Sequence, residues 1–360
     1  MDLIRPFQRD DIPPVLELFR WAFARNGHHA PPGIPLDTYF ERVFFENPWY
    51  DEDLPSLVHV NDTGSIDGFI GVQPKRLQFR GRRLRLIAAT KLMAAPTAAP
   101  LVASRLVRHV LAGPQDLLFS DISNDAARRI FEALGGAATI LLYSMKWQRP
   151  VRPARYALSW MRARGTPTLV TQSLRPLAAI ADTALARWGP SAARSHFARD
   201  GYSVGDLPLD VAAKRLPDLL PSRALQPEYD ERWLAWLLGL AQQMDPQRVL
   251  RRRLVRDAHQ EPVGWFFYRI EPGGLAEVLQ LVARKDARAP VFDALLLDAW
   301  STGATMVAGR LEPSMVREMS TRHCYFRQAD YWTLVHTKDS EILDAILSGN
   351  ALLSRLEGEW

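Results

Sequence analysis

The segment IDGFIGVQPKRLQFRGRRLRLIAATKLMAAP, residues 66–96, carries most of the fold prediction. Two runs rich in aliphatic residues lie on either side of Gly81, which suits a tight turn between strands. With the preceding run SLVHVN, residues 56–61, they predict a meander of antiparallel strands. Arginine and leucine alternate over 83–86, as expected for a sheet with one face in water.

Helices and further strands are expected on both sides of this meander. A short strand at 3–4 precedes a helix that Asp10 or Asp11 can cap. The order β-α-α-β-β-β-α-β-α-β is therefore expected over residues 1–150. Its other elements are a helix at 36–45, a helix at 97–111, a buried strand at 116–121, a helix at 125–134 and a strand at 138–147.

The second half repeats the core of this order. Its expected elements are strands at 251–255, 263–270 and 276–284, a helix at 292–300, a strand at 303–311, a helix at 313–321 and a strand at 331–336. This repeat predicts two tandem α/β (α+β) domains, each a mixed, mostly antiparallel sheet flanked by helices. The expected domains are 1–150 and 225–360, joined by a linker and packing insert at 151–224 that contains one clear helix, at 174–188.

The composition is that of an ordinary globular chain, with 360 residues, 47% hydrophobic, 24% charged and a net charge of +5. Cys324 is the single cysteine, which excludes a disulfide framework and a cysteine-based zinc cluster. The start, MDLIRPFQRDD, lacks a signal-peptide pattern, and no apolar run approaches the ~20 residues of a membrane span. We therefore expect a cytoplasmic protein without a bound metal.

The predicted element order resembles that of the GNAT superfamily of N-acyltransferases. The resemblance rests on IRPFQRDDIPPVLELF at 4–19, on the meander at 66–96, and on SNDAARRIFEALGG at 123–136. The last segment is similar to the family pattern Asn-x-x-Ala…Leu-Gly, here Asn124, Ala127, Leu134 and Gly135. Residues 225–340 are similar through DERWLAW at 230–236 and through Gly264. The whole chain then resembles a tandem GNAT protein, a layout shared more distantly with Fem-type aminoacyl transferases.

The resemblance implies acetyl-CoA or another acyl-CoA as cofactor. In such a fold the fourth and fifth strands splay apart, and the pantetheine arm pairs with the exposed edge like an added strand. The following helix turns its N-terminus, with its unpaired N–H groups, toward the pyrophosphate. The cofactor-binding residues that the resemblance implies are Leu92, Met93, Ala94, Thr97, Leu101, Asn124, Ala127 and Phe131.

The phosphate loop departs from the family pattern Gln/Arg-x-x-Gly-x-Gly/Ala. The equivalent stretch, TAAPLVAS at 97–104, has no glycine and no arginine, and Pro100 removes one N–H donor. The second half has ARKDARAPVFD at 283–293, again without glycine, although Arg284, Lys285 and Arg288 are available to contact phosphates or to lie in a solvated turn. A weakened or absent cofactor site is therefore one of the expectations.

The catalytic residues are expected at the end of the fifth strand and after it. Asp121 is the best-placed carboxylate for a general base, and its alternative role is to cap the helix that follows Asn124. Many family members use a tyrosine on that helix to protonate the thiolate, where this chain has Phe131. Tyr143, on the next strand, is the candidate substitute.

Several other features have two interpretations. The basic hairpin from Lys75 to Arg85 is either a solvated sheet face or a surface that steers an anionic partner. Trp233, Trp236 and Trp265 pack in a core or form a platform for the acceptor. His28-His29 is expected in a loop, His59 is expected to be structural, and Cys324 is not expected to act as a nucleophile.

Three functions follow from these observations. The first is an acyl-CoA-dependent N-acyltransferase, an N-acetyltransferase by preference, acting on a small-molecule or peptide amine. The second is a Fem-like transferase with an aminoacyl-tRNA donor. The tandem layout, the basic hairpin and the missing phosphate loop favour it. The third is a non-catalytic GNAT-like binding module with a degenerate cleft. The acceptor, the active half and the oligomeric state stay open.

Overall fold

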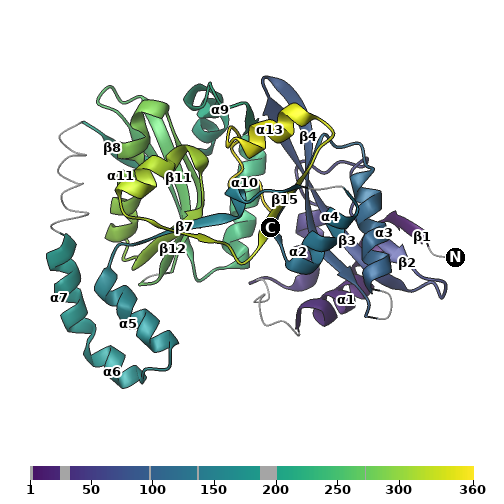
Figure 1. Cartoon of the computed structure of the whole chain (residues 1–360), viewed down its shortest axis with the longest axis horizontal. Helices are drawn as coiled ribbons and strands as arrows, with labels where there is room; N and C mark the ends of the chain where they lie inside the picture. The colour runs from purple at the N-terminus through teal and green to yellow at the C-terminus, as the bar shows by residue number, and fades with distance from the viewer. Residues whose placement is uncertain (1–2, 25–32, 97–98, 136–137, 187–200, 272) are drawn as a thin grey trace. The chain divides into compact units, whose positions relative to one another are not determined.

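The computed structural model describes residues 3–24, 33–96, 99–135, 138–186, 201–271 and 273–360. The chain forms two compact units (Figure 1). The first unit comprises residues 1–144, 222–246 and 328–360, and the second comprises 145–221 and 247–327. Neither unit is continuous in sequence, so the units do not follow the expected boundaries at 150 and 224.

The first unit is built on a sheet with the strand order β1-β2-β3-β4-β5-β15-β6, with β9 paired to β3 off this path. The strands are β1 (Leu3–Pro6), β2 (Leu57–Val60), β3 (Ile66–Phe79), β4 (Arg82–Ala94), β5 (Leu117–Ser123), β6 (Ala138–Thr139), β9 (Leu225–Pro227) and β15 (Trp332–His336). The predicted meander is confirmed as β2, β3 and β4, which pair antiparallel. The strands β4 and β5 are parallel.

Helices cover both faces of this sheet. They are α1 (Ile12–Ala24), α2 (Leu36–Phe44), α3 (Ala99–Leu111), α4 (Asp125–Ala133), α10 (Glu231–Met244) and α13 (Ser340–Leu347). Alternation along β5 separates two cores, because Leu118 joins the cluster under α3 and α4 while Phe119 joins the cluster under α13. Asn124 caps α4 by accepting from the backbone N–H of Ala127 at 2.9 Å, and Gly135 ends it with φ 65°.

The second unit has a sheet of the order β14-β7-β13-β12-β11-β10-β8. Its strands are β7 (Met145–Pro150), β8 (Ser203–Asp206), β10 (Val249–Arg256), β11 (Pro262–Ile270), β12 (Leu275–Ala283), β13 (Met306–Arg310) and β14 (Tyr325–Gln328). Its helices are α5 (Pro153–Ala163), α6 (Thr168–Ser173), α7 (Arg175–Ala186), α9 (Leu209–Leu219), α11 (Arg288–Ser301) and α12 (Val316–Thr321). Thus the linker expected at 151–224 contains three helices besides the predicted α7.

The two sheets have the same internal order. Read from β1 and from β8, the positions correspond one to one, and in each sheet the parallel pair is the fourth strand with the fifth. This supports the repeat inferred from the sequence. No helix among the described residues has both the length and the apolar character needed to cross a bilayer.

The first sheet takes β9 and β15 from the second half of the sequence, and the second sheet takes β7 from the first half. The strand expected at 138–147 is wrong as a single element, since a 3-10 turn at Leu142–Ser144 divides it into β6 of the first sheet and β7 of the second. Conversely β15, expected in the second domain, lies beside β5 in the first sheet. Ser144 fixes the break, because its Oγ accepts from the backbone N–H of Thr333 at 2.8 Å.

Candidate functional site

The parallel strands β4 and β5 separate after three residue pairs. Pairing runs from Leu86–Leu117 to Ala88–Phe119, after which β4 continues to Ala94 and β5 to Ser123. A bulge bends β4 at this point, since Lys91 has φ 53° and the β3 register shifts between Phe69 and Gly71. The edge of β4 beyond Ala88 therefore faces a gap, as the resemblance implies.

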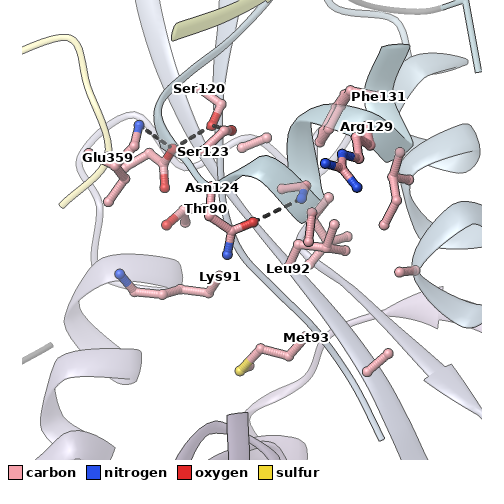
Figure 2. A pocket seen from close by; sticks show the side chains of 18 of the residues that line it. Thr90, Lys91, Leu92, Met93, Ser120, Ser123, Asn124, Arg129, Phe131 and Glu359 are labelled. Atoms are coloured by element: carbon pink, nitrogen blue, oxygen red, sulfur yellow. Dashed lines mark hydrogen bonds between the residues drawn. The ribbon is translucent and has the colours of Figure 1, made fainter. Parts of the chain in front are cut away.

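A pocket of about 470 Å³ lies in this gap, within the first unit, and its size suits a small molecule or part of a cofactor. Figure 2 shows β4 residues Lys91, Leu92 and Met93 on one side and Ser120, Ser123 and Asn124 on the other. Apolar side chains form much of its wall. They include Phe23, Ile70, Met93, Ile122, Ile130 and Phe131.

The pocket brings together six of the eight residues implied for the cofactor. These are Leu92, Met93, Ala94, Asn124, Ala127 and Phe131. Leu101 is 64% exposed and is absent from the lining, because it lies on the solvent side of α3, away from the buried face that contains Val102 and Leu106. Thr97 lies outside the described residues.

Glu359 enters the pocket from a segment that sequence reasoning did not consider. Its Oε1 accepts from the Oγ of Ser120 at 2.5 Å and from the backbone N–H groups of Asp121 and Ile122 at 3.2 and 3.3 Å. Burial raises the pKa of Glu359, and the nearby charge of Asp121 adds to the rise. The residue is thus a carboxylate held by donors, lining the gap between the strands. Nothing in the local sequence EGEW signals this role, because the pairing with β5 is non-local.

The two predicted catalytic residues hold the segment that carries Glu359. The Asp121 carboxylate accepts from the backbone N–H of Glu359 at 2.7 Å and from Arg355 at 3.2 Å. The hydroxyl of Tyr143 donates to the backbone oxygen of Ala351 at 2.6 Å. Neither Asp121 nor Tyr143 is among the residues that line the pocket.

We call residues 351–360 the tail segment. All of them except Arg355 are buried in the first unit. Beneath the segment, Lys75 Nζ donates to the backbone oxygens of Leu356 and Gly358 at 3.1 and 2.7 Å, and burial lowers the pKa of Lys75 to about 7. Glu357 accepts from Ser354 and Tyr229, and burial raises its pKa. The tail segment is therefore packed in the core of the first unit and held there by hydrogen bonds.

The sequence matches no protein-family model and no curated protein. Solved structures do match. A probable N-acyltransferase from Enterococcus faecalis V583 has a TM-score of 0.57 at 8% identity, covering 94% of this chain and 73% of that one. A GCN5-related N-acetyltransferase from Kribbella flavida has 0.56 at 15% identity, covering 94% and 72%. The chain has a GNAT-type fold.

A GCN5-related N-acetyltransferase from Anabaena variabilis is similar to the same extent, with a TM-score of 0.57 at 11% identity over 94% of this chain and 74% of that one. An N-myristoyltransferase from Saccharomyces cerevisiae with bound myristoyl-CoA has a TM-score of 0.50 at 9% identity, covering 93% and 77%. The predicted GNAT-type fold is confirmed, while the Fem-type likeness stays a prediction.

The pocket lining includes two cationic side chains and the first turn of α3. Arg129 and Lys91 line the pocket, and Arg129 forms no ion pair with any residue that the structure describes. Pro100 lies in the first turn of α3 and also lines the pocket, so one backbone donor is missing where a phosphate is expected.

The basic hairpin is paired with acids of the first unit. Ion pairs join Arg80 to Glu341, Arg82 to Asp339, Arg83 to Glu228 and Arg85 to Asp51. Lys75 is buried and Arg76 lies over the ring of Trp49. This neutralisation weakens the case for a tRNA surface on the hairpin.

The remaining candidates have structural surroundings. Trp233 is buried and stacks on Trp49 with ring centroids 4.1 Å apart, and Trp265 is buried with its Nε1 donating to Gln280 at 3.0 Å. Burial raises the pKa of Cys324 to about 12, which leaves the thiol protonated. His59 contacts the carboxylate of Asp67, and Arg284 forms an ion pair with Asp286.

Two further expectations concern histidine and metal. His28 and His29 lie outside the described residues. Within the ranges that the structure describes, no group of three or more His, Cys, Asp or Glu side chains is placed to hold a metal ion.

Proposed function

We propose that the protein is an N-acyltransferase that moves an acyl group from acyl-CoA, with acetyl-CoA as the first donor to test, to an amine by direct attack. One observation carries this proposal. The open edge of β4 beyond Ala88 lies beside a pocket that contains the buried carboxylate of Glu359.

The residues present fit an acyl-CoA in three respects. The unpaired edge of β4 offers main-chain groups to the amides of a pantetheine arm. The apolar wall with Met93 and Phe131 suits a thioester and its acyl group. Arg129, which lines the pocket, supplies positive charge for phosphates. When bound, the thioester supplies the activated carbonyl carbon.

Glu359 is the residue that we assign as general base. A buried carboxyl with a raised pKa is better matched to an amine near neutral pH than an ordinary carboxylate is. It accepts one proton from the attacking amine while the C–N bond forms and the C–S bond breaks. The sulfur leaves as a thiolate that takes a proton from solvent, since Phe131 has no proton to donate.

A bulky substitution at the pocket rim tests the donor site. Ala126 is exposed and lines the pocket, so Ala126→Trp fills the opening without disturbing the core. We expect acetyl-CoA affinity, measured by isothermal titration calorimetry, to fall at least tenfold. Ala133→Trp is the matched control, because Ala133 is exposed on the same helix but does not line the pocket. Equal affinity for both variants, or no heat from the parent protein, contradicts the proposal.

The missing N–H donor gives a second test of the same site. Pro100→Gly adds a donor at the first turn of α3, and we expect acetyl-CoA to bind roughly two- to tenfold tighter, the range of one ordinary added hydrogen bond. Pro290→Gly, in the first turn of α11, is the control and should leave the affinity unchanged. Unchanged or weaker binding by Pro100→Gly would show that the phosphates lie elsewhere.

A further inference from the structure

A group of three helices in the second unit exposes many large apolar side chains. We call residues 153–186, with α5, α6 and α7, the helical insert (Figure 1). Leu169 is 80% exposed and Ile180 is 68% exposed. The other large apolar side chains exposed on the insert are Trp160, Val170, Leu177 and Leu185.

The exposed side chains lie on the faces that the insert does not use for its own packing. Asp182 is buried and accepts from the backbone N–H groups of Ala154 and Arg155 at 2.8 and 3.2 Å, which fixes α7 against the start of α5. Ala178 is buried on the same side of α7. Leu177 and Ile180, three residues apart, therefore form an outward stripe on α7.

The charges of the insert are almost all positive. It contains four arginines and one acid, Asp182, whose carboxylate is buried in the contact just described. Arg162, Arg164 and Arg175 are exposed, and the guanidinium of Arg164 lies 3.6 Å from the ring centre of Trp160. The accessible surface is thus aliphatic and cationic, with no accessible acid in the insert.

We propose that the helical insert docks the protein on an anionic lipid surface. Leucine, isoleucine and valine side chains enter the boundary between headgroups and acyl chains, and arginines contact the lipid phosphates. A tryptophan with a cation beside it suits the same interfacial zone.

Two features favour lipid over a protein partner. The exposed apolar side chains are spread over all three helices, and acyl chains close around such side chains without needing a matching groove. A second copy of this chain would bring arginine surfaces against each other, because the insert and the whole chain are both net positive. The proposal is independent of the acyltransferase activity.

Vesicle flotation of the full chain tests the proposal. We expect binding to vesicles of phosphatidylcholine with phosphatidylglycerol, much less binding to phosphatidylcholine alone, and release by high salt. Leu169→Ser with Ile180→Ser should lower the partition coefficient at least tenfold. Arg162→Glu with Arg175→Glu should lower it for anionic vesicles. These side chains are exposed, so unfolding temperatures should match the parent.

The controls remove exposed apolar side chains elsewhere. Val249→Ser with Leu347→Ser takes away two residues that are 50% and 51% exposed outside the insert, and binding should persist. Failure of the parent to float, or equal binding by both double serine variants, overturns the proposal. A dimer in light scattering that the Leu169/Ile180 variant loses would assign the surface to a second copy. Binding to polyglutamate without vesicle binding would assign it to an acidic protein; either result also overturns the proposal.

Discussion

Glu359→Gln is expected to lower the rate of acyl transfer about 100-fold or more, the usual contribution of a positioned general base. The amide oxygen of glutamine can still accept from Ser120 and from the backbone N–H groups of β5, so the tail segment keeps its place. Acetyl-CoA affinity should therefore change little. The measurement is thiol release with a panel of amines, together with calorimetry of donor binding.

The pH profile separates a base from a structural residue. Burial raises the pKa of Glu359, so the parent's rate should rise with pH through a midpoint above the ordinary glutamate range. The glutamine variant should lose this limb. Glu341→Gln, at a surface ion pair with Arg80, is the matched control and should keep both rate and profile. A Glu359→Gln rate within threefold of the parent would remove Glu359 from the mechanism.

Gly358→Ala is expected to lower the free energy of unfolding by about 2–3 kcal/mol, because overpacking a rigid buried site forces its neighbours to move. A Cβ at this position would lie 2.0 Å from Oδ2 of Asp121 and 2.6 Å from Arg355. Asp121 cannot easily withdraw, since its other oxygen accepts from the backbone N–H of Glu359. Thermal unfolding should show a lower transition for the first unit.

The control for this substitution is Gly239→Ala in α10. A Cβ there meets nothing within 4 Å, and alanine favours helix, so stability should hold or rise by up to about 1 kcal/mol. Adding Asp121→Ala to Gly358→Ala relieves the overlap, so the two changes should be non-additive. Equal stability of Gly358→Ala and the parent would show that the tail segment is not tightly packed against β5.

The local elements of the first unit were predictable because their signals are local. Arginine–leucine alternation marked β4, and Asn124 and Gly135 marked the ends of α4. Part of the pocket wall followed from the family resemblance, which placed Met93 on the fourth strand and Phe131 on the helix after the fifth. The strand and helix predictions needed only periodicity and caps, whereas the pocket residues came from the resemblance alone.

The non-local parts were not predictable in the same way. Periodicity shows that 332–336 is a strand but not which sheet it joins. The strand was therefore expected in the sheet of the second domain, whereas β15 lies beside β5 in the first sheet. Asp121 was predicted as a base from its place at the end of β5, yet what lies against it is the tail segment, more than two hundred residues later. Side-chain partners at such separation leave no mark in the local pattern.

The exchange of β7 and β15 constrains how the protein emerges from the ribosome. When the first five strands of the first sheet have been translated, the strand that lies beside β5 is still some two hundred codons away. The edge of β5 therefore stays unpaired, exposed to solvent or to a chaperone, until the strands of the second sheet have left the exit tunnel. Glu359 is translated after β15, so the pocket between β4 and β5 lacks this buried carboxyl in any shorter nascent chain.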